Sequence, residues 1–237
     1  MMRGVMASEW LKIRRKGIWL LIALGPLGVV GLQALNFFLR YDYLTKRYAD
    51  DLWGAVIGNV HQLSVPTLLM GIAIVASMIA GIEHQTNAWK QTLALPVSKW
   101  CVFACKFTLL CTLLVCACTL LAAGTVVLGI ALGYGTDIPL VTLLVKSYLP
   151  FLAAMPFAAL QTWLSITIKN QAIPLTTGVL FSVLCLFGTA VGDWVPLKWL
   201  YLENQWNEPF YSAGPGLLLG LVIYVISLIH FIRKDVS

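Results

Sequence analysis

The polar residues best placed to do mechanical work lie in one stretch, 83–106, between two hydrophobic runs. Thr86 and Asn87 are good N-cap residues for a short helix over 88–95, because a side-chain oxygen can accept a hydrogen bond from the first free backbone amides. Pro96 would end that helix. The pattern predicts a capped helix held between two membrane segments.

The side chains of this short helix indicate what it could bind. Trp89 and Leu93 are four residues apart, so one face would be apolar, and Lys90 would lie on another. Glu83 stands where the preceding hydrophobic run ends, and Lys106 would anchor the return to the membrane at its interface. An apolar knob of this kind suits docking into a groove on a partner protein. The alternative is an interfacial helix that packs only on lipid headgroups.

The composition identifies the class of protein. The chain has 237 residues, of which 59% are hydrophobic and 11% are charged, whereas a soluble domain carries roughly 25% charged residues. The apolar runs are continuous, and they lack the alternation of barrel strands. We therefore expect an all-α integral membrane protein that forms a single transmembrane permease domain over 1–237.

The hydrophobic runs predict six membrane spans. Their approximate bounds are 17–38, 65–82, 107–132, 148–168, 172–192 and 214–232. Ahead of them, 1–16 combines basic residues with an apolar stripe at helical spacing, which is typical of an amphipathic helix in the membrane surface. A frayed basic tail that only sets orientation is the alternative for that segment.

The basic residues predict the orientation. Six spans place both termini on one side, and eleven of the 16 Lys and Arg residues fall on that side. Because basic loops stay in the cytoplasm, both termini and the stretch 83–106 are expected there.

The sequence lacks the usual motifs of catalysis and ATP binding. It has no HExxH, no GxSxG and no GxxxxGK[ST] phosphate loop. The six cysteines lie in or beside the hydrophobic runs, which favours packing over a disulfide framework or a metal site. We therefore predict no enzymatic activity, no resident metal and no cofactor in this chain. If the chain performs mechanical work, the energy would come from ATP bound by another chain.

Two further groups of residues are candidate binding sites. Polar side chains within the spans could line a transport pathway, and the candidates are Gln33, Asn36 and Gln161. The connection 193–213 is rich in aromatic residues, and its candidate contacts for a substrate are Trp194, Trp199, Trp206 and Tyr211. An aromatic belt at the outer membrane interface is the alternative interpretation of that connection.

Three motifs resemble those of type-2 ATP-binding cassette (ABC) exporter permeases, in particular the lantibiotic-immunity and bacitracin-resistance permeases. The main motif is ExxxNxWKxxLxxPVSK from Glu83, followed by Lys106. The amphipathic start SEWLKxxR from Ser8 and the basic end FIRKD from Phe231 are also similar.

The resemblance implies a function and a set of partners. Two copies of a separate ABC ATPase would bind ATP and Mg, and a second permease, either identical or a sister subunit, would complete the assembly. Residues 83–95 would form the coupling helix, and the cargo would be an amphiphilic peptide expelled from the bacterial cytoplasmic membrane. No nucleic acid is expected as a partner. A non-transporting scaffold or sensor that works with an ABC ATPase is one alternative, and an intramembrane enzyme is another.

Overall fold

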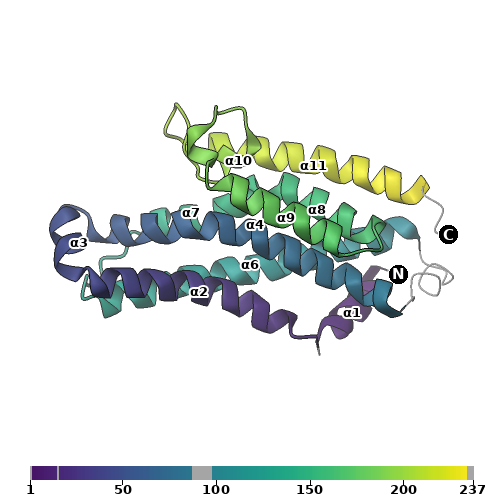
Figure 1. Cartoon of the computed structure of the whole chain (residues 1–237), viewed down its shortest axis with the longest axis horizontal. Coiled ribbons are helices and arrows are strands. Elements are labelled where there is room, and N and C mark those ends of the chain that lie inside the picture. Colours follow the sequence, from purple (N-terminus) through teal and green to yellow (C-terminus); the bar gives the residue numbers. More distant parts are fainter. Residues whose placement is uncertain (1, 15, 87–97, 234–237) are drawn as a thin grey trace.

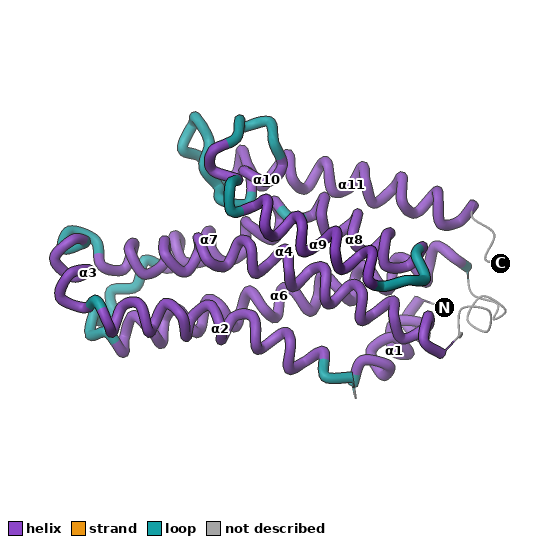
Figure 2. Tube along the Cα trace, viewed as in Figure 1, coloured by secondary structure: helices purple, strands orange, loops and turns teal. Residues whose placement is uncertain are grey.

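The computed structural model describes residues 2–14, 16–86 and 98–233, and these residues form an elongated bundle of helices (Figures 1 and 2). The elements are α1 (Met2–Ile13), α2 (Ile18–Leu39), α3 (Tyr41–Arg47), α4 (Leu52–Thr86), α6 (Lys99–Ala131), α7 (Leu140–Ala153), α8 (Met155–Thr167), α9 (Ala172–Cys185), η1 (Gly188–Ala190), α10 (Pro196–Trp199) and α11 (Phe210–Arg233). The described residues contain no strand, which agrees with the all-α expectation.

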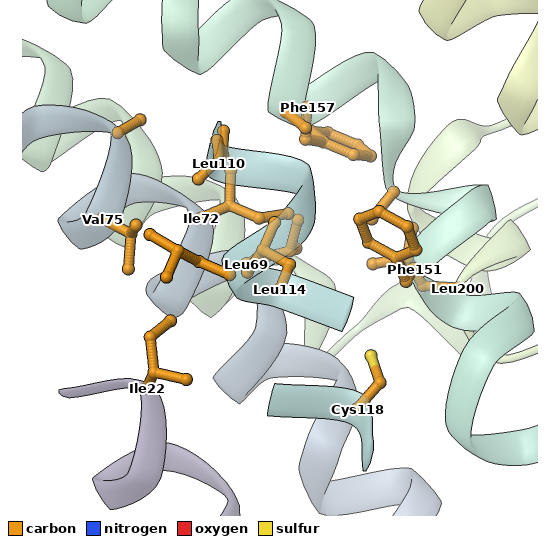
Figure 3. Packing of buried hydrophobic residues seen from close by; sticks show 14 of the residues in the cluster. Ile22, Leu69, Ile72, Val75, Leu110, Leu114, Cys118, Phe151, Phe157 and Leu200 are labelled. Carbon is orange, nitrogen blue, oxygen red and sulfur yellow. The ribbon is translucent and has the colours of Figure 1, made fainter. Parts of the chain in front are cut away.

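Helix α4 is the centre of the bundle. It packs against α2, α6, α7, α8 and α9, and its buried face includes Leu69 and Ile72. These side chains meet Leu110 and Leu114 of α6 and Phe157 of α8 in the main core (Figure 3). Lipid tails are as apolar as these side chains, so close van der Waals packing, rather than removal from water, holds such helices together in a membrane. Through this packing α4 fixes the positions of its neighbours.

The membrane-spanning helices follow the predicted runs in part. Four helices are long and apolar enough to cross a bilayer, namely α2, α4, α6 and α11, and α7 with α8 would make a fifth, bent span. Helix α9 has only 14 residues. A sixth crossing through α9 therefore stays a prediction, as does the side of the membrane on which the termini lie.

Two predicted boundaries differ from the observed helices. Helix α4 begins at Leu52, whereas the expected span 65–82 began later. The added turns bury Trp53, Val56 and Val60. The polar Asn59 among them donates its Nδ2 hydrogen to the carbonyl of Ala55. A helix can therefore continue through this segment although its sequence reads as polar.

The expected span 148–168 is broken rather than continuous. Helices α7 and α8 meet at Ala154 with a bend of 44°. Pro156 lies in the first turn of α8. Proline has no N–H to donate to the preceding turn, and its ring clashes with the carbonyl four residues earlier, so a continuous helix breaks there.

One end of the bundle gathers segments that are far apart in sequence. Helix α1, the end of α4, the start of α6 and the end of α11 all lie there, whereas α3 lies at the opposite end (Figure 1). This arrangement places the helices that flank residues 87–97 next to the N-terminal helix.

Candidate functional site

Four charged side chains form a buried cluster at the end of the bundle that holds α1. Lys106 Nζ lies 2.7 Å from Glu9 Oε2 and 2.7 Å from Glu83 Oε2. Lys12 Nζ lies 2.5 Å from Glu9 Oε1 and 2.8 Å from Glu83 Oε1. Each ammonium thus bridges the same two carboxylates, and the four charges close into a ring. We call this set of four residues, Glu9, Lys12, Glu83 and Lys106, the charge ring.

The charge ring is enclosed by protein. The side chains of Glu83 and Lys106 are each 1% exposed and that of Glu9 is 3% exposed, whereas that of Lys12 is 29% exposed. Removing an ion from water costs several kcal/mol, and the cost is met only when each charge has close partners of opposite sign. Two positive and two negative charges balance here, so the ring is neutral as a unit.

The pKa shifts of the two α1 residues agree with this geometry. Burial alone would raise the pKa of the Glu9 carboxyl, but the charge and hydrogen bond of Lys106, with those of Lys12, hold it below its ordinary value. Burial would likewise lower the pKa of Lys12, but hydrogen bonds to Glu83 and Glu9 raise it. Both groups are therefore held in their charged forms.

Three helices supply the charge ring. Glu9 and Lys12 are three residues apart and share one face of α1. Glu83 is in the last turn of α4, immediately before the segment 87–97, and Lys106 is in the second turn of α6, just after it. The charge ring thus joins α1 to both helices that flank the predicted coupling segment.

One prediction about this end of the bundle is corrected by the structure. Lys106 does not anchor the chain at the lipid interface, because it is buried within the charge ring. The buried face of α1 is centred on Glu9 and Ile13, and Met2 and Trp10 are exposed. Trp10 packs edge-on against Trp19 of α2, with ring centroids 5.4 Å apart. Placement of α1 in the membrane surface stays a prediction.

The predicted coupling residues fall mostly outside the described part of the chain. Glu83 is described and belongs to the charge ring, and Thr86 ends α4. The remaining coupling residues lie outside the described residues; they are Asn87, Trp89, Lys90, Leu93 and Pro96. Their role as a docking helix stays a prediction.

The predicted pathway residues lie in two separate places. Gln33 and Asn36 are neighbours on α2; Gln33 Nε2 donates to the carbonyl of Asn59 at 3.1 Å, and Asn36 Nδ2 donates to Gln33 Oε1 at 3.3 Å. Gln161 is buried in α8, where its Nε2 donates to the carbonyl of Pro174 at 2.7 Å. Gln161 therefore ties α8 to α9 and does not join the polar pair on α2.

The aromatic connection divides into exposed and packed residues. Trp194, Trp206 and Tyr211 are exposed, and the rings of Trp206 and Tyr211 lie 5.5 Å apart. Trp199 is different, because it packs against the main core and its Nε1 donates to the carbonyl of Asp193 at 2.6 Å. Trp199 therefore has a structural role in this connection, and the other three remain available for contact with a ligand or lipid.

The sequence reasoning missed most of the charge ring. Glu9, Lys12 and Lys106 were not predicted as site residues, although Glu9 is the only acidic residue ahead of the first span. A lone carboxylate three residues from a lysine was the available signal. It could not identify Lys106 as a partner, because 97 positions separate Lys106 from Glu9.

The comparison with family models gives one match, to the ABC-2 family transporter proteins over residues 5–188. That match covers more than half of the chain. The chain belongs to the ABC-2 transporter family. Comparisons with curated proteins and with solved structures gave no match. Membership in the ABC-2 family implies a multi-pass membrane permease that works with an ABC ATPase.

The extent of the ABC-2 match separates the two candidate regions. All four residues of the charge ring fall within residues 5–188, whereas the exposed aromatic residues of the connection before α11 lie beyond it. The charge ring is thus part of the segment that defines this chain as an ABC-2 protein, and the aromatic connection is not.

Proposed function

We propose that this chain is the permease subunit of an ATP-driven exporter that expels an amphiphilic peptide antibiotic, or a related lipophilic compound, from the membrane. The observation that carries the proposal is the charge ring in an ABC-2 family chain, because it fastens α1 to the two helices that flank residues 87–97.

In the proposed mechanism, the energy enters through residues 83–95. A separate ABC ATPase, present in two copies, binds ATP and Mg and presses on this segment when it closes. Glu83 begins this segment and Lys106 follows it, and both form ion pairs with the charged residues of α1, Glu83 with Lys12 and Lys106 with Glu9. Because a closed ring of short ion pairs resists separation, α1, α4 and α6 would move together and change the packing of the spans.

The proposed topology has six spans with both termini in the cytoplasm of a bacterial cell. Support comes from α9, which begins after α8 and leads to η1 and α10 before α11 (Figure 1). A crossing by α9 would let α11 return to the end of the bundle that holds α1. The basic residues concentrated at that end favour the cytoplasm. A second permease, identical or a sister subunit, would complete the assembly.

Co-purification with the ATPase tests the assembly. The tagged chain is expressed together with each candidate cassette ATPase of its source genome, and we expect one of them to purify with the chain as one complex. The double variant Trp89→Ala with Leu93→Asp should lose the ATPase, whereas the control Trp194→Ala, at an exposed position beyond the family match, should retain it. Equal recovery in both variants would contradict docking through residues 88–95.

The hydrolysis rate of the complex then separates export from a scaffold role. An exporter should hydrolyse ATP faster when an amphiphilic peptide that it carries is added. Intact assembly with a hydrolysis rate that no amphiphile changes would favour a scaffold or sensor that works with the ATPase.

A further inference from the structure

An apolar pocket lies among the candidate membrane-spanning helices, and none of the charge-ring residues lines it. It has a volume of about 330 Å³ and is lined by residues of α2, α4, α6 and α7. Small-molecule sites in proteins measure about 300–1,000 Å³, so this pocket is large enough to hold part of a ligand. Four of its lining residues, Ile22, Val75, Leu114 and Cys118, are labelled in Figure 3.

Small residues and a proline line the pocket where α2 and α4 leave space between them. Pro26 lies inside α2 and borders the pocket. A Cβ atom added at Gly28 or at Gly71 would meet no atom within 4 Å. The two helices therefore face each other here across space that no side chain fills.

The lining of the pocket accepts hydrocarbon and offers little to a polar group. The hydroxyls of Ser64 and Thr67 donate within α4, to the carbonyls of His61 and Leu63. The other lining residues are almost all apolar. A polar group placed here would lose its hydrogen bonds to water without replacement. The chemistry of the lining thus selects an alkyl chain.

The length and position of the pocket fit one chain of a lipid leaflet. Its lining on α2 runs from Leu21 to Leu32, a rise of about 16 Å at 1.5 Å per residue. The hydrocarbon core of a bilayer is about 30 Å thick, so the pocket spans about one leaflet. Leu24 and Leu32, at its rim, are each 58% exposed, which places the opening toward lipid.

Polar and basic groups follow directly beyond one end of the pocket. Gln33 and Asn36 continue the helix face that carries Val29 and Leu32, and both are half-buried. Arg40, exposed, caps the end of α2 one turn later. An amide pair followed by a guanidinium suits the phosphate of a phospholipid headgroup, because guanidinium donates charge-assisted hydrogen bonds to phosphate oxygens.

We propose that this pocket binds one acyl chain of a bilayer phospholipid, whose phosphate lies beside Asn36 and Arg40. This site is distinct from the coupling end of the protein and does not depend on the identity of the cargo. The bound lipid would fill the space between α2 and α4 in the resting permease.

The test uses phosphatidylglycerol with a photoreactive diazirine in the middle of one acyl chain, added to the full chain in phosphatidylcholine nanodiscs. After illumination, the labelled peptides are identified by mass spectrometry. We expect labelling on α2 and α4 within the pocket lining. The variants Gly28→Leu and Gly71→Leu, which fill the pocket from its two walls, should each reduce that labelling at least fivefold.

A matched variant controls for general lipid contact. Gly31→Leu also adds a side chain to α2 where a Cβ would meet no atom within 4 Å, but Gly31 does not line the pocket. Its labelling should equal that of the wild type. All variants are compared as monodisperse protein in nanodiscs. If either filling variant folds and labels as strongly as Gly31→Leu, the probe reports lipid around the protein and the proposal is overturned.

Competition tests the headgroup part of the proposal. Unlabelled phosphatidylglycerol should displace the probe at least tenfold better than diacylglycerol, which has the same chains and no phosphate. The advantage should fall severalfold in Arg40→Gln. Equal displacement by the two lipids would overturn recognition of the phosphate.

Discussion

Replacing Lys106 by methionine is expected to lower the free energy of unfolding by about 3–5 kcal/mol, the usual cost of removing one partner of a buried ion pair. Methionine keeps the length and apolar stem of the side chain but removes the ammonium. Glu9 and Glu83 then face each other within the bundle with only Lys12 between them. The loss comes mainly from the negative charge that is left without compensation.

The distances support a loss of this size. Each contact of Lys106 with a carboxylate is 2.7 Å long. At an effective dielectric constant of about 20, one such contact is worth about 6 kcal/mol before desolvation is subtracted. Desolvation of the ions offsets several kcal/mol of that attraction. The attraction that remains for the two contacts together after desolvation is consistent with a net loss of several kcal/mol in the free energy of unfolding when Lys106 is replaced.

The measurement is reversible unfolding of the purified chain in mixed micelles, titrated with a denaturing detergent and followed by tryptophan fluorescence. The double variant Lys106→Met with Glu9→Gln restores a balanced Lys12–Glu83 pair, so it should recover about 2 kcal/mol of the loss. The control Lys46→Met, at an exposed site on α3, should change stability by less than about 0.5 kcal/mol. A Lys106→Met variant as stable as this control would refute the claim that the charge ring stabilises the packing of α1, α4 and α6.

Three further predictions concern stability in the same assay. The folded-state pKa of Glu9 lies below its ordinary value of 4.5, so the stability that its carboxylate contributes is present above pH 4.5 and is lost as the pH falls through the folded pKa. Glu9→Gln should therefore flatten the acid limb of a stability–pH profile. An unchanged acid limb would argue against a lowered pKa of Glu9. A Cβ at Gly220 would lie 2.8 Å from a backbone carbon of α8, so Gly220→Leu should destabilise the protein by about 1–3 kcal/mol. Gly214→Leu, at a position with open space around it, should not destabilise the protein. Equal effects of the two variants would place the α8–α11 contact elsewhere. Trp199→Phe removes a half-buried indole hydrogen bond and should cost about 1 kcal/mol. Trp194→Phe, at a site that is 82% exposed, should cost nearly nothing, and a reversed order would count against the packing of this connection.

Continuous apolar runs made the spanning helices predictable. The runs 17–38 and 214–232 agree closely with α2 and α11, because a continuous apolar run without the alternation of barrel strands satisfies its backbone in a bilayer only as a helix. The start of α4 was placed too late, since the polar residues between Leu52 and Ser64 find partners that the sequence does not display. His61, for example, contacts the carbonyls of Lys146 and Tyr201, which lie 85 and 140 positions away.

The candidate site was predictable only in its local part. Glu83 could be singled out because it borders a polar gap between two hydrophobic runs. The ion pairs of Glu83 could not be predicted, because its partners Lys12 and Lys106 come from α1 and α6. A sequence with several acidic and basic residues does not show which of them form pairs in the fold. The bend between α7 and α8 had a visible cause in Pro156, but proline tolerates either a kink or a full break within the membrane.

The proposed function requires that an ATPase drives this permease to move an amphiphile out of the membrane. It is tested most directly in sealed proteoliposomes that contain the chain with its cassette ATPase and a panel of fluorescently labelled amphiphilic peptides. We predict that at least one peptide leaves the membrane only when ATP and Mg are present on the ATPase side, and that Trp89→Ala with Leu93→Asp abolishes this movement. Coupled ATP hydrolysis by the intact complex without movement of any peptide would contradict export by this permease.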